Sequence, residues 1–257
     1  MADEPECVIS VRGLKTQFGD QVVLDGLDLD VERGEVIGVV GGSGTGKSVL
    51  LRTIVGLNPL RAGHIVVFGK DMAGLSREDR SRMEGRWGVL FQDGALFSSL
   101  TVAQNVAVPL KEHSDLPPRL IDELIALKIG MVGLPPEAAG KYPSELSGGM
   151  RKRAGLARAL ALDPEIVFLD EPTAGLDPIG AAAFDELIAS LQRNLGLTVF
   201  MVTHDLDSLW AICDRIAVLA EKRVLIVGSM EVMLQQDHAW IHQYFHGPRA
   251  RAAQALT

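Results

Sequence analysis

One segment, residues 41–48, constrains the fold of this chain more than any other. Its sequence, GGSGTGKS, fills every fixed position of the pattern G-x-x-x-x-G-K-[ST]. The apolar run at 36–40 that precedes it is typical of a buried strand, and the segment 49–55 that follows is typical of a helix that ends at Gly56. A strand, a glycine loop and a helix form the context in which this pattern binds phosphate. The alternative interpretation is a plain glycine turn before a helix.

The glycine loop can offer a phosphate both backbone and side-chain groups. Glycines let backbone N–H groups turn toward an anion, and the N-terminus of the next helix adds about half a positive charge. Lys47 can reach the β- and γ-phosphates of a nucleotide, and the hydroxyl of Ser48 can bind Mg²⁺. The predicted phosphate-binding residues are Gly41, Gly42, Ser43, Gly44, Thr45, Gly46, Lys47, Ser48 and Val49.

The composition of the whole chain limits the possible functions. A chain of 257 residues with 47% apolar residues can form one large domain, or a domain with a subdomain. Its net charge of −8 argues against a broad surface for nucleic acid. The acidic segment 1–6 is unlike a secretory signal, and no apolar run approaches the roughly 18 residues of a membrane span. We therefore expect a soluble chain with no nucleic-acid partner, in which Cys7 and Cys213 are reduced cytosolic thiols.

Local patterns divide the chain into strand-rich and helix-rich parts. Period-two alternation at 8–12 and 22–31 predicts an antiparallel β subdomain. Helical patterning dominates 101–161 and indicates a helical insertion. Apolar strand patterns then return at 166–169 and 198–203, separated by a helical pattern. This alternation predicts an α/β fold with a largely parallel sheet.

An acid pair follows one of the predicted strands. Asp170 and Glu171 come directly after 166–169, at the carboxyl end where open α/β sheets bind ligands. The first acid can hold Mg²⁺, and the second can activate or orient a water that attacks a γ-phosphate. Because burying two acids without a function is costly, we favour this chemical role.

A second glycine segment, LSGGM at 146–150, also precedes a helical pattern. Ser147 and the amide of Gly149 can form another anion site at the N-terminus of that helix. Taken alone, these residues fit a plain helix cap equally well. The basic run at 151–153 predicts a solvated helix face.

These motifs, in their order and spacing, resemble those of the nucleotide-binding subunit of ABC transporters over nearly the whole chain. Residues 41–48 are similar to the Walker A motif of that family, 166–171 to its Walker B motif and 146–150 to its signature loop. Residues 174–177 correspond to the D-loop. The single-residue correspondences are the Q-loop glutamine Gln92, the switch histidine His204 and the adenine-stacking aromatic Phe18.

The resemblance implies an architecture and two cofactors. The fold would be α/β, a P-loop NTPase core of the RecA type with a mostly parallel sheet, an antiparallel β subdomain and an α-helical subdomain inserted at about 95–160. A single ATPase domain would span 7–245, followed by a C-terminal tail at 246–257. The implied cofactors are ATP and Mg²⁺. The implied Mg²⁺ ligands are Ser48, Gln92 and Asp170.

The resemblance also implies a mechanism in which two copies of the chain close head-to-tail over two ATP molecules. The signature residues of one copy would contact the γ-phosphate bound by Lys47 of the other, near the D-loop residue Asp177. Glu171 would be the catalytic base, and His204 would hold the γ-phosphate and the water. Gln92 would connect Mg²⁺ to the membrane partner. The implied signature contacts are Ser147, Gly148 and Gly149.

Three positions depart from the usual pattern of the family. Position 150 is Met where most members have Gln, the D-loop opens with Ala174 and Gly175, and Phe18 stands where Tyr is common. No departure removes a charge or a Mg²⁺ ligand, so we expect an active ATPase. An alternative for Phe18 is that it fills the interior of the antiparallel β subdomain.

Two segments narrow the resemblance to one group of transporters. LSGGMRKR at 146–153 and FQDGALFSSL at 91–100 resemble the ATPases of Mla and Mce-associated lipid transporters. This implies a homodimer that works with a multi-span permease, an Mce-type lipid-binding protein and a STAS-domain protein. It also implies phospholipid as the indirect cargo and a peripheral location on the cytoplasmic face of the bacterial inner membrane.

Other functions remain open at this point. The chain can instead be the ATPase of an importer of amino acids, metal or another small solute, or a soluble ABC ATPase outside transport. A soluble member of that kind usually has two nucleotide domains or a long coiled-coil insertion, and this chain has neither. A P-loop kinase would leave Ser147 and His204 unexplained.

The segment near the C-terminus carries an apolar stripe at helical spacing, formed by Trp240, Ile241, Tyr244 and Phe245. The stripe can dock on the chain's own domain, on the second subunit or on the STAS partner. A helix would also align three histidines, which can bind metal. We do not expect a metal site there, because no Glu completes a zinc-protease motif. The histidines are His238, His242 and His246.

Overall fold

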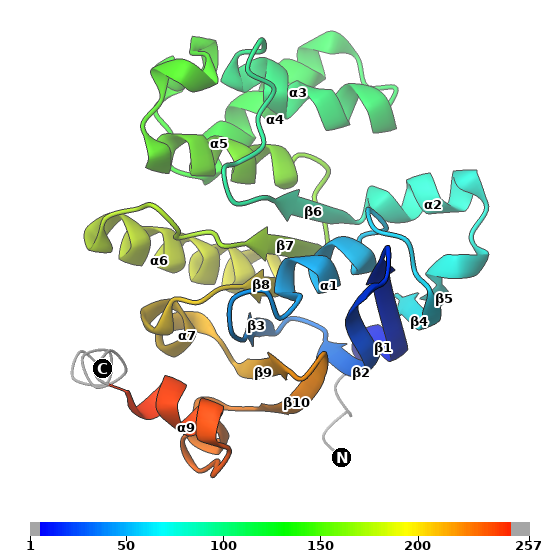
Figure 1. Ribbon diagram of the computed structural model, residues 1–257. Coiled ribbons are helices and arrows are strands. Elements are labelled where there is room, and N and C mark those ends of the chain that lie inside the picture. Colours follow the sequence, from blue (N-terminus) through cyan, green and yellow to red (C-terminus); the bar gives the residue numbers. More distant parts are fainter. Residues whose placement is uncertain (1–5, 248–257) are drawn as a thin grey trace, which may run out of the picture.

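The computed structural model describes residues 6–247, and its centre is a six-stranded sheet in the order β10-β9-β3-β8-β7-β6 (Figure 1). Pairing is parallel from β9 to β6, and β10 is antiparallel to β9. All residues of β3, β7 and β8 are buried, as expected for parallel strands covered on both faces. The strands are β3 (Val36–Val40), β6 (Trp87–Leu90), β7 (Ile166–Asp170), β8 (Thr198–Val202), β9 (Arg215–Ala220) and β10 (Arg223–Gly228).

A second sheet is antiparallel and has the order β2-β1-β4-β5. Its apolar side chains share one core with the helix α1 (Lys47–Ile54) and with Phe168 and Phe200 of the central sheet. The predicted α/β fold with parallel and antiparallel sheets is confirmed. The strands of this sheet are β1 (Cys7–Phe18), β2 (Gln21–Glu32), β4 (Ala62–Val67) and β5 (Lys70–Asp71).

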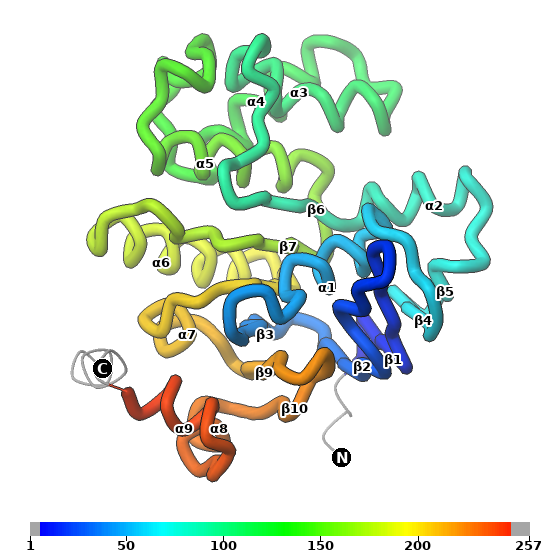
Figure 2. The backbone as a smooth tube through the Cα atoms, viewed as in Figure 1, coloured from blue at the N-terminus to red at the C-terminus, as the bar shows by residue number. Residues whose placement is uncertain are grey.

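Helices are inserted between β6 and β7 and form the green upper part of Figure 1. The tube in Figure 2 shows the chain leaving β6, passing through these helices and returning as β7. Local signals set where the helices begin: Thr101 forms a capping box with Gln104, and Pro118 is the first residue of its helix. The helices are α3 (Val102–His113), α4 (Pro118–Met131) and α5 (Gly148–Ala159), with short 3-10 turns at Pro136–Gly140 and Pro143–Glu145.

The inserted helices pack against the opposite face of the central sheet from α1. Val106, Ile129 and Leu156 share a core with Val167 and Leu169 of β7, and with the helix α6 (Pro178–Leu195). Phe168, between those two β7 residues, points into the other core. The period-two alternation of one buried strand therefore joins the two halves of the molecule.

Four short helical elements have no counterpart among the predicted ones. The helix α2 buries only Met83, so it offers no apolar periodicity to detect. The others are too short for a helical period to stand out from neighbouring strands. The four are the 3-10 turn Met72–Gly74, α2 (Arg77–Glu84), α7 (Leu206–Ile212) and α8 (Met230–Leu234).

The C-terminal apolar stripe forms the helix α9 (Ala239–His246), which packs on the chain's own domain. Ile241 and Phe245 are buried against Val40 of β3, Leu209 of α7 and Met233 of α8. Of the three predicted docking partners, these two side chains therefore use the chain's own domain. The last ten residues of the predicted tail, 248–257, lie outside the described residues.

The three histidines of this segment do not form a ligand cluster. The rings of His242 and His246 stack at 4.5 Å between centroids, and Nε2 of His246 lies 2.8 Å from the carbonyl oxygen of Leu234. Within residues 6–247, no three side chains of His, Cys, Asp or Glu are grouped as metal ligands would be.

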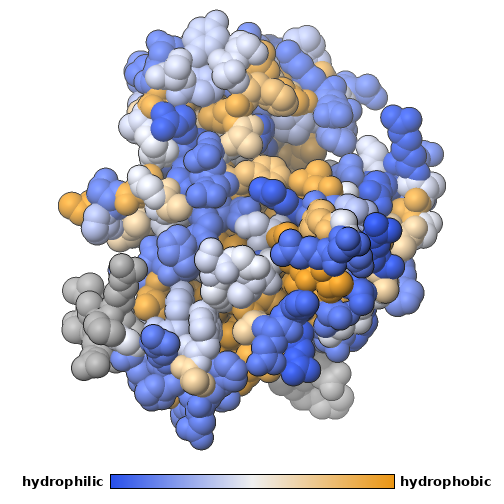
Figure 3. All heavy atoms as spheres, viewed as in Figure 1, coloured by the Kyte–Doolittle hydropathy of each residue, from blue (hydrophilic) through white to orange (hydrophobic). Residues whose placement is uncertain are grey.

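The surface mixes hydrophilic and hydrophobic residues. In the space-filling view, orange patches appear over the inserted helices and near the middle of the molecule, separated by hydrophilic side chains (Figure 3). Among the helices of residues 6–247, none combines the length and the apolar character needed to span a bilayer.

Candidate active site

Three neighbouring parallel strands bring the predicted site residues to one edge of the central sheet. The strands β3, β8 and β7 lie next to one another, and the glycine loop, His204 and Glu171 follow their carboxyl ends. In parallel strands these ends share an edge, which is where such sheets bind ligands. Residues more than a hundred positions apart in sequence therefore meet at one place.

The glycine loop has a backbone shape that other residues would not accept. A Cβ atom at Gly41 would lie 2.2 Å from the carbonyl oxygen of Leu219. At Gly46 the φ angle is 102°, and a Cβ atom would lie 2.8 Å from Cγ1 of Val23. Gly41 is restricted by contact with backbone, and Gly46 by both contact and conformation. A plain turn before α1 does not need that combination.

The side chain of Lys47 folds back onto the glycine loop and bonds its backbone. Its Nζ donates hydrogen bonds to the carbonyl oxygens of Gly41, at 2.9 Å, and Gly42, at 3.0 Å. Burial lowers the pKa of Lys47, and the nearby carboxyl groups of Glu171 and Asp170 oppose that shift. The ammonium group thus sits in the loop where phosphate oxygens would be received.

Ser48 and Asp170 form a pair of oxygen donors beside Lys47. The hydroxyl of Ser48 donates to Oδ1 of Asp170 at 2.8 Å, and Asp170 is buried. A hydroxyl and a carboxylate are ligands that suit Mg²⁺. Gln92, the third predicted Mg²⁺ ligand, has an exposed side chain in the loop after β6.

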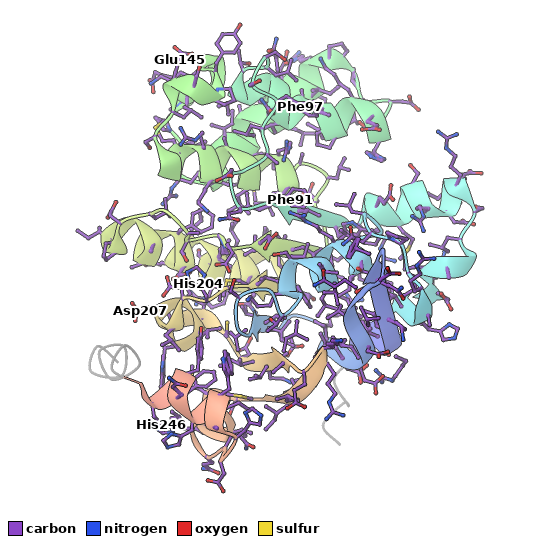
Figure 4. All side chains as sticks on the ribbon, in the orientation of Figure 1. Phe91, Phe97, Glu145, His204, Asp207 and His246 are labelled. Carbon is purple, nitrogen blue, oxygen red and sulfur yellow. The ribbon has the colours of Figure 1, made fainter. Side chains whose placement is uncertain are left out.

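Glu171 and His204 meet across the loops that follow β7 and β8. Nδ1 of His204 lies 2.7 Å from Oε2 of Glu171, and the imidazole is 65% exposed. Glu171 has a φ angle of 52°, an unusual value for a residue with a side chain. Its N–H donates to the carbonyl oxygen of Val202 at 2.8 Å, which ties this conformation to β8. In Figure 4, His204 lies beside α7, between α6 and the lower part of the central sheet.

Lys152 contributes to the site in a way that its sequence did not indicate. Its side chain is 5% exposed, and Nζ donates to the carbonyl oxygens of Gln92, at 2.8 Å, and Glu171, at 2.9 Å. The prediction that 151–153 is a solvated face is therefore wrong for Lys152. Because a buried ammonium needs hydrogen-bond acceptors, Lys152 links the loop that contains Gln92 to the loop that contains Glu171.

The signature and D-loop residues lie at helix N-termini and face outward. The hydroxyl of Ser147 accepts from the N–H of Met150 at 3.3 Å and caps α5. Asp177 caps α6 by accepting from the N–H of Gly180 at 2.9 Å. Both residues are exposed. Gly148 lines a small cavity with Gln92 and Gly175, which brings the three loops together.

Phe18 ends β1 and is 45% exposed. The alternative in which it fills the interior of the antiparallel sheet is wrong, because the inward positions of β1 are taken by other residues. Those residues are Val8, Ile9, Val11, Leu14 and Thr16. An exposed ring at a strand end is free to stack on a ligand.

Comparison with known protein families matches residues 24–174 to the family described as ABC transporter. The chain belongs to the ABC transporter family. The intermembrane phospholipid transport ATP-binding protein MlaF of Haemophilus influenzae is 40% identical over 240 residues, which cover 93% of this chain and 90% of that protein. The probable ribonucleotide transport ATP-binding protein mkl of Mycobacterium leprae is 39% identical over 241 residues, or 94% of this chain and 69% of that protein.

Solved structures of ABC proteins share the fold. One is the dimeric ATP-binding cassette MJ0796 in a post-hydrolysis state bound to ADP and Pi, with a TM-score of 0.78 and 27% identity over 86% of this chain and 98% of that one. Another is cbiO1 of Clostridium perfringens, part of the complex cbiONQ, with a TM-score of 0.80 and 30% identity over 98% and 99% of the two chains. The predicted membership of the ABC family, its α/β fold and its ATPase class are confirmed.

A buried polar network ties this ABC ATPase site to the helices beneath it. The hydroxyl of Ser208 on α7 donates to Oδ2 of Asp185 on α6 at 2.8 Å. Thr173, two residues after Glu171, donates to Asp205, the neighbour of His204, at 3.2 Å. Oδ1 of Asp185 has no hydrogen-bond partner among the described residues. No sequence motif marks these residues, because only the packing of α6 on α7 places them together.

Asp185 gives the stability of this ATPase a dependence on pH. Burial raises the pKa of Asp185 to about 6, above the unfolded value of roughly 3.9. Between these two pKa values the Asp185 carboxyl is protonated in the folded chain and ionised in the unfolded chain. Protonation of Asp185 therefore stabilises the fold at low pH, and this stabilisation is lost as the pH rises through 6. We expect the contribution of Asp185 to fall by about 1 kcal/mol between pH 5 and pH 7.5.

Denaturant unfolding at several pH values measures this effect. Asp185→Asn should remove that part of the pH dependence, whereas Glu186→Gln, which neutralises an exposed neighbour on the same helix, should retain it. Parallel stability–pH curves for the wild type and Asp185→Asn would contradict the assignment.

Proposed function

We propose that this chain is the ATP-hydrolysing subunit of a transporter that moves phospholipid between the membranes of a bacterium. The observation that carries the proposal is the Glu171–His204 contact of 2.7 Å beside the glycine loop. It occurs in a chain 40% identical to a relative named for intermembrane phospholipid transport. The geometry supports ATP hydrolysis, and the relative supports the cargo.

In this proposal the phosphates of ATP lie in the loop 41–49. Lys47 turns from the carbonyl oxygens of Gly41 and Gly42 to the β- and γ-phosphate oxygens, a charge-assisted contact. Phe18 stacks on the adenine. Ser48, Asp170 and Gln92 hold Mg²⁺, which when bound neutralises charge on the phosphates.

Glu171 acts as the catalytic base in the proposed reaction. Its carboxylate accepts a proton from the water that attacks the γ-phosphate, while His204 holds the γ-phosphate and the water in line. The Val202 carbonyl and Lys152 both fix the backbone of Glu171. The protein therefore contributes mainly position and electrostatics, as phosphoryl transfer requires.

The proposed enzyme is a homodimer in which each copy completes the site of the other. Ser147, Gly148 and Gly149 at the N-terminus of α5 contact the γ-phosphate bound to the partner, and Asp177 lies at the same interface. Support comes from the exposure of Ser147 and Asp177 and from the dimeric state of the solved relative MJ0796. Helix N-termini favour negative charge, which suits this role.

The proposed membrane partner is a multi-span permease, joined by a STAS-domain protein and an Mce-type lipid-binding protein. The chain would then lie peripherally on the cytoplasmic face of the inner membrane. We place the surface that contacts the permease on the loop that follows Gln92, because Phe97 in this loop is a large apolar side chain that is 52% exposed. Figure 4 shows Phe91 and Phe97 on the path from β6 into the inserted helices.

A second candidate cargo is a small solute. The Mycobacterium leprae relative, named for probable ribonucleotide transport, is nearly as similar to this chain as the MlaF relative. The ATPase site is the same in both candidates, so only a transport measurement separates them.

Two substitutions test the assigned chemistry. Lys47→Ala should weaken ATP binding, because charge-assisted contacts to phosphate are about twice as strong as neutral ones. Glu171→Gln should keep ATP binding and slow hydrolysis by about 10²–10⁴-fold, the usual contribution of a general base. Nucleotide-binding titrations and phosphate release measure the two effects. The controls Lys70→Ala and Glu186→Gln change exposed residues of the same types, and hydrolysis by Glu171→Gln at the wild-type rate would exclude the base.

Mixed dimers test the exchange of residues between copies. Lys47→Ala and Ser147→Arg proteins should each be inactive alone. When the two are mixed, one of the two sites in a mixed dimer combines an intact Lys47 with an intact Ser147, so part of the ATPase activity should return. An inactive mixture that nevertheless forms dimers by size-exclusion chromatography with light scattering would place both residues in a single-chain site.

Reconstitution tests the cargo. The chain with its co-purified permease, in vesicles containing a fluorescent phospholipid, should move that lipid when ATP is added. The Glu171→Gln complex should bind ATP and move no lipid. ATP-driven uptake of a ribonucleotide without lipid movement would replace phospholipid by the second candidate.

A further inference from the structure

The helix α9 presents two different faces to the rest of the molecule. Ile241 and Phe245 anchor it in the core under β3 and β9. Trp240 and Tyr244 occupy the adjacent face, are only half-buried and stack on each other at 4.8 Å between ring centroids. Both rings pack on the edge of the same core, and Tyr244 also contacts the loop that carries His204.

The first contact is with the switch histidine. The hydroxyl of Tyr244 donates to the backbone carbonyl oxygen of His204 at 3.0 Å. Burial raises the pKa of Tyr244, and the carboxyl groups of Glu171 and Asp205 raise it further. The hydroxyl therefore keeps its proton and remains a donor. His204 lies in the loop between β8 and α7, so neither a strand nor a helix holds this residue directly.

The second neighbour is the glycine loop. A Cβ atom added at Gly42 would lie 3.8 Å from Nε1 of Trp240, so the indole faces this part of the loop and leaves room for little more than one atom between them. The carbonyl of Gly42 also receives the Lys47 ammonium. The stacked pair therefore spans from the phosphate loop at one end to His204 at the other.

We propose that Tyr244 is a positioning residue for ATP hydrolysis, acting through His204. Its hydroxyl holds the His204 backbone so that the imidazole stays 2.7 Å from Glu171, and Trp240 stacks on the Tyr244 ring and holds it in place. The inference rests on the proposed roles of His204 and Glu171. It adds the C-terminal helix, which is distant in sequence from every nucleotide motif except His204, to the segments that position the site.

Local contacts explain why a tie from outside the loop matters. Thr203 is bonded to β3 through the carbonyl of Val39 at 3.2 Å, and its hydroxyl accepts from the N–H of Asp205 at 3.0 Å. Both contacts fix the neighbours of His204. The Tyr244 hydroxyl bonds the backbone of His204 itself, so its loss leaves the imidazole with the Glu171 contact but without this backbone tie.

The substitution Tyr244→Phe removes the hydroxyl and keeps the ring. We expect kcat for ATP hydrolysis to fall by about two- to ten-fold, the range of one neutral hydrogen bond. KM for ATP should stay close to wild type because the glycine loop does not change, and the unfolding midpoint should fall by no more than the loss of one hydrogen bond allows. The matched control is Tyr142→Phe at the only other tyrosine of the chain, which is exposed on the inserted segment.

A double-mutant cycle with His204→Ala separates positioning from a general effect on the fold. If Tyr244 acts through His204, Tyr244→Phe should have no further effect on kcat once the imidazole is absent. Equal losses in the two backgrounds would overturn the inference and assign Tyr244 a structural role. An unchanged kcat in the single variant Tyr244→Phe would overturn it as well.

The same measurements distinguish the failure of this inference from failure of the proposed function. If His204→Ala hydrolyses ATP at the wild-type rate, the role of His204 is wrong and the role of Tyr244 falls with it. If His204→Ala is impaired while Tyr244→Phe is not, the proposed function stands and only the positioning role is excluded.

Discussion

The parallel pairing of β3, β8 and β7 is the constraint on which the rest of the structure depends. It places the glycine loop, His204 and Glu171 at one edge of the sheet, although these residues are widely separated in sequence. Both faces of the strands are covered, one by α1 with the antiparallel sheet and the other by α6 with the inserted helices. The alternation of β7 between the two cores fixes where this edge lies, so the backbone of the site is in place before a nucleotide binds.

Buried polar contacts then connect the loops at that edge. Ser48 bonds Asp170, and Lys152 bonds the backbones of both Gln92 and Glu171. Each contact satisfies a buried group that would otherwise be costly, so the loops cannot move independently without losing hydrogen bonds. Tyr244 extends the same arrangement to the C-terminal helix. The site is consequently a set of loops whose backbones are held by side chains, and some of these side chains come from helices outside the motifs.

Much of the fold was accessible from sequence because its signals are local. Buried strands appear as apolar runs, Thr101 and Pro118 mark helix starts, and the glycine loop has one well-understood shape. The prediction failed where packing overrides local character. Lys152 belongs to a basic run that predicts a solvated face, yet its position on α5 directs its side chain into the site. The helix α2 was missed because it buries almost nothing.

The sequence by itself determined the class of the protein: an α/β ATPase of the ABC family, with a phosphate loop, an acid pair and a switch histidine in a fixed order. These are short-range patterns, in which each residue type is required by the chemistry or conformation at its own position. Only the tertiary structure decided which distant groups support them, namely Lys152 beneath Gln92, Asp185 beneath Ser208 and Tyr244 beside His204. Such contacts depend on how helices pack across the sheet, and packing leaves no local signature because many side chains can satisfy the same donor or acceptor.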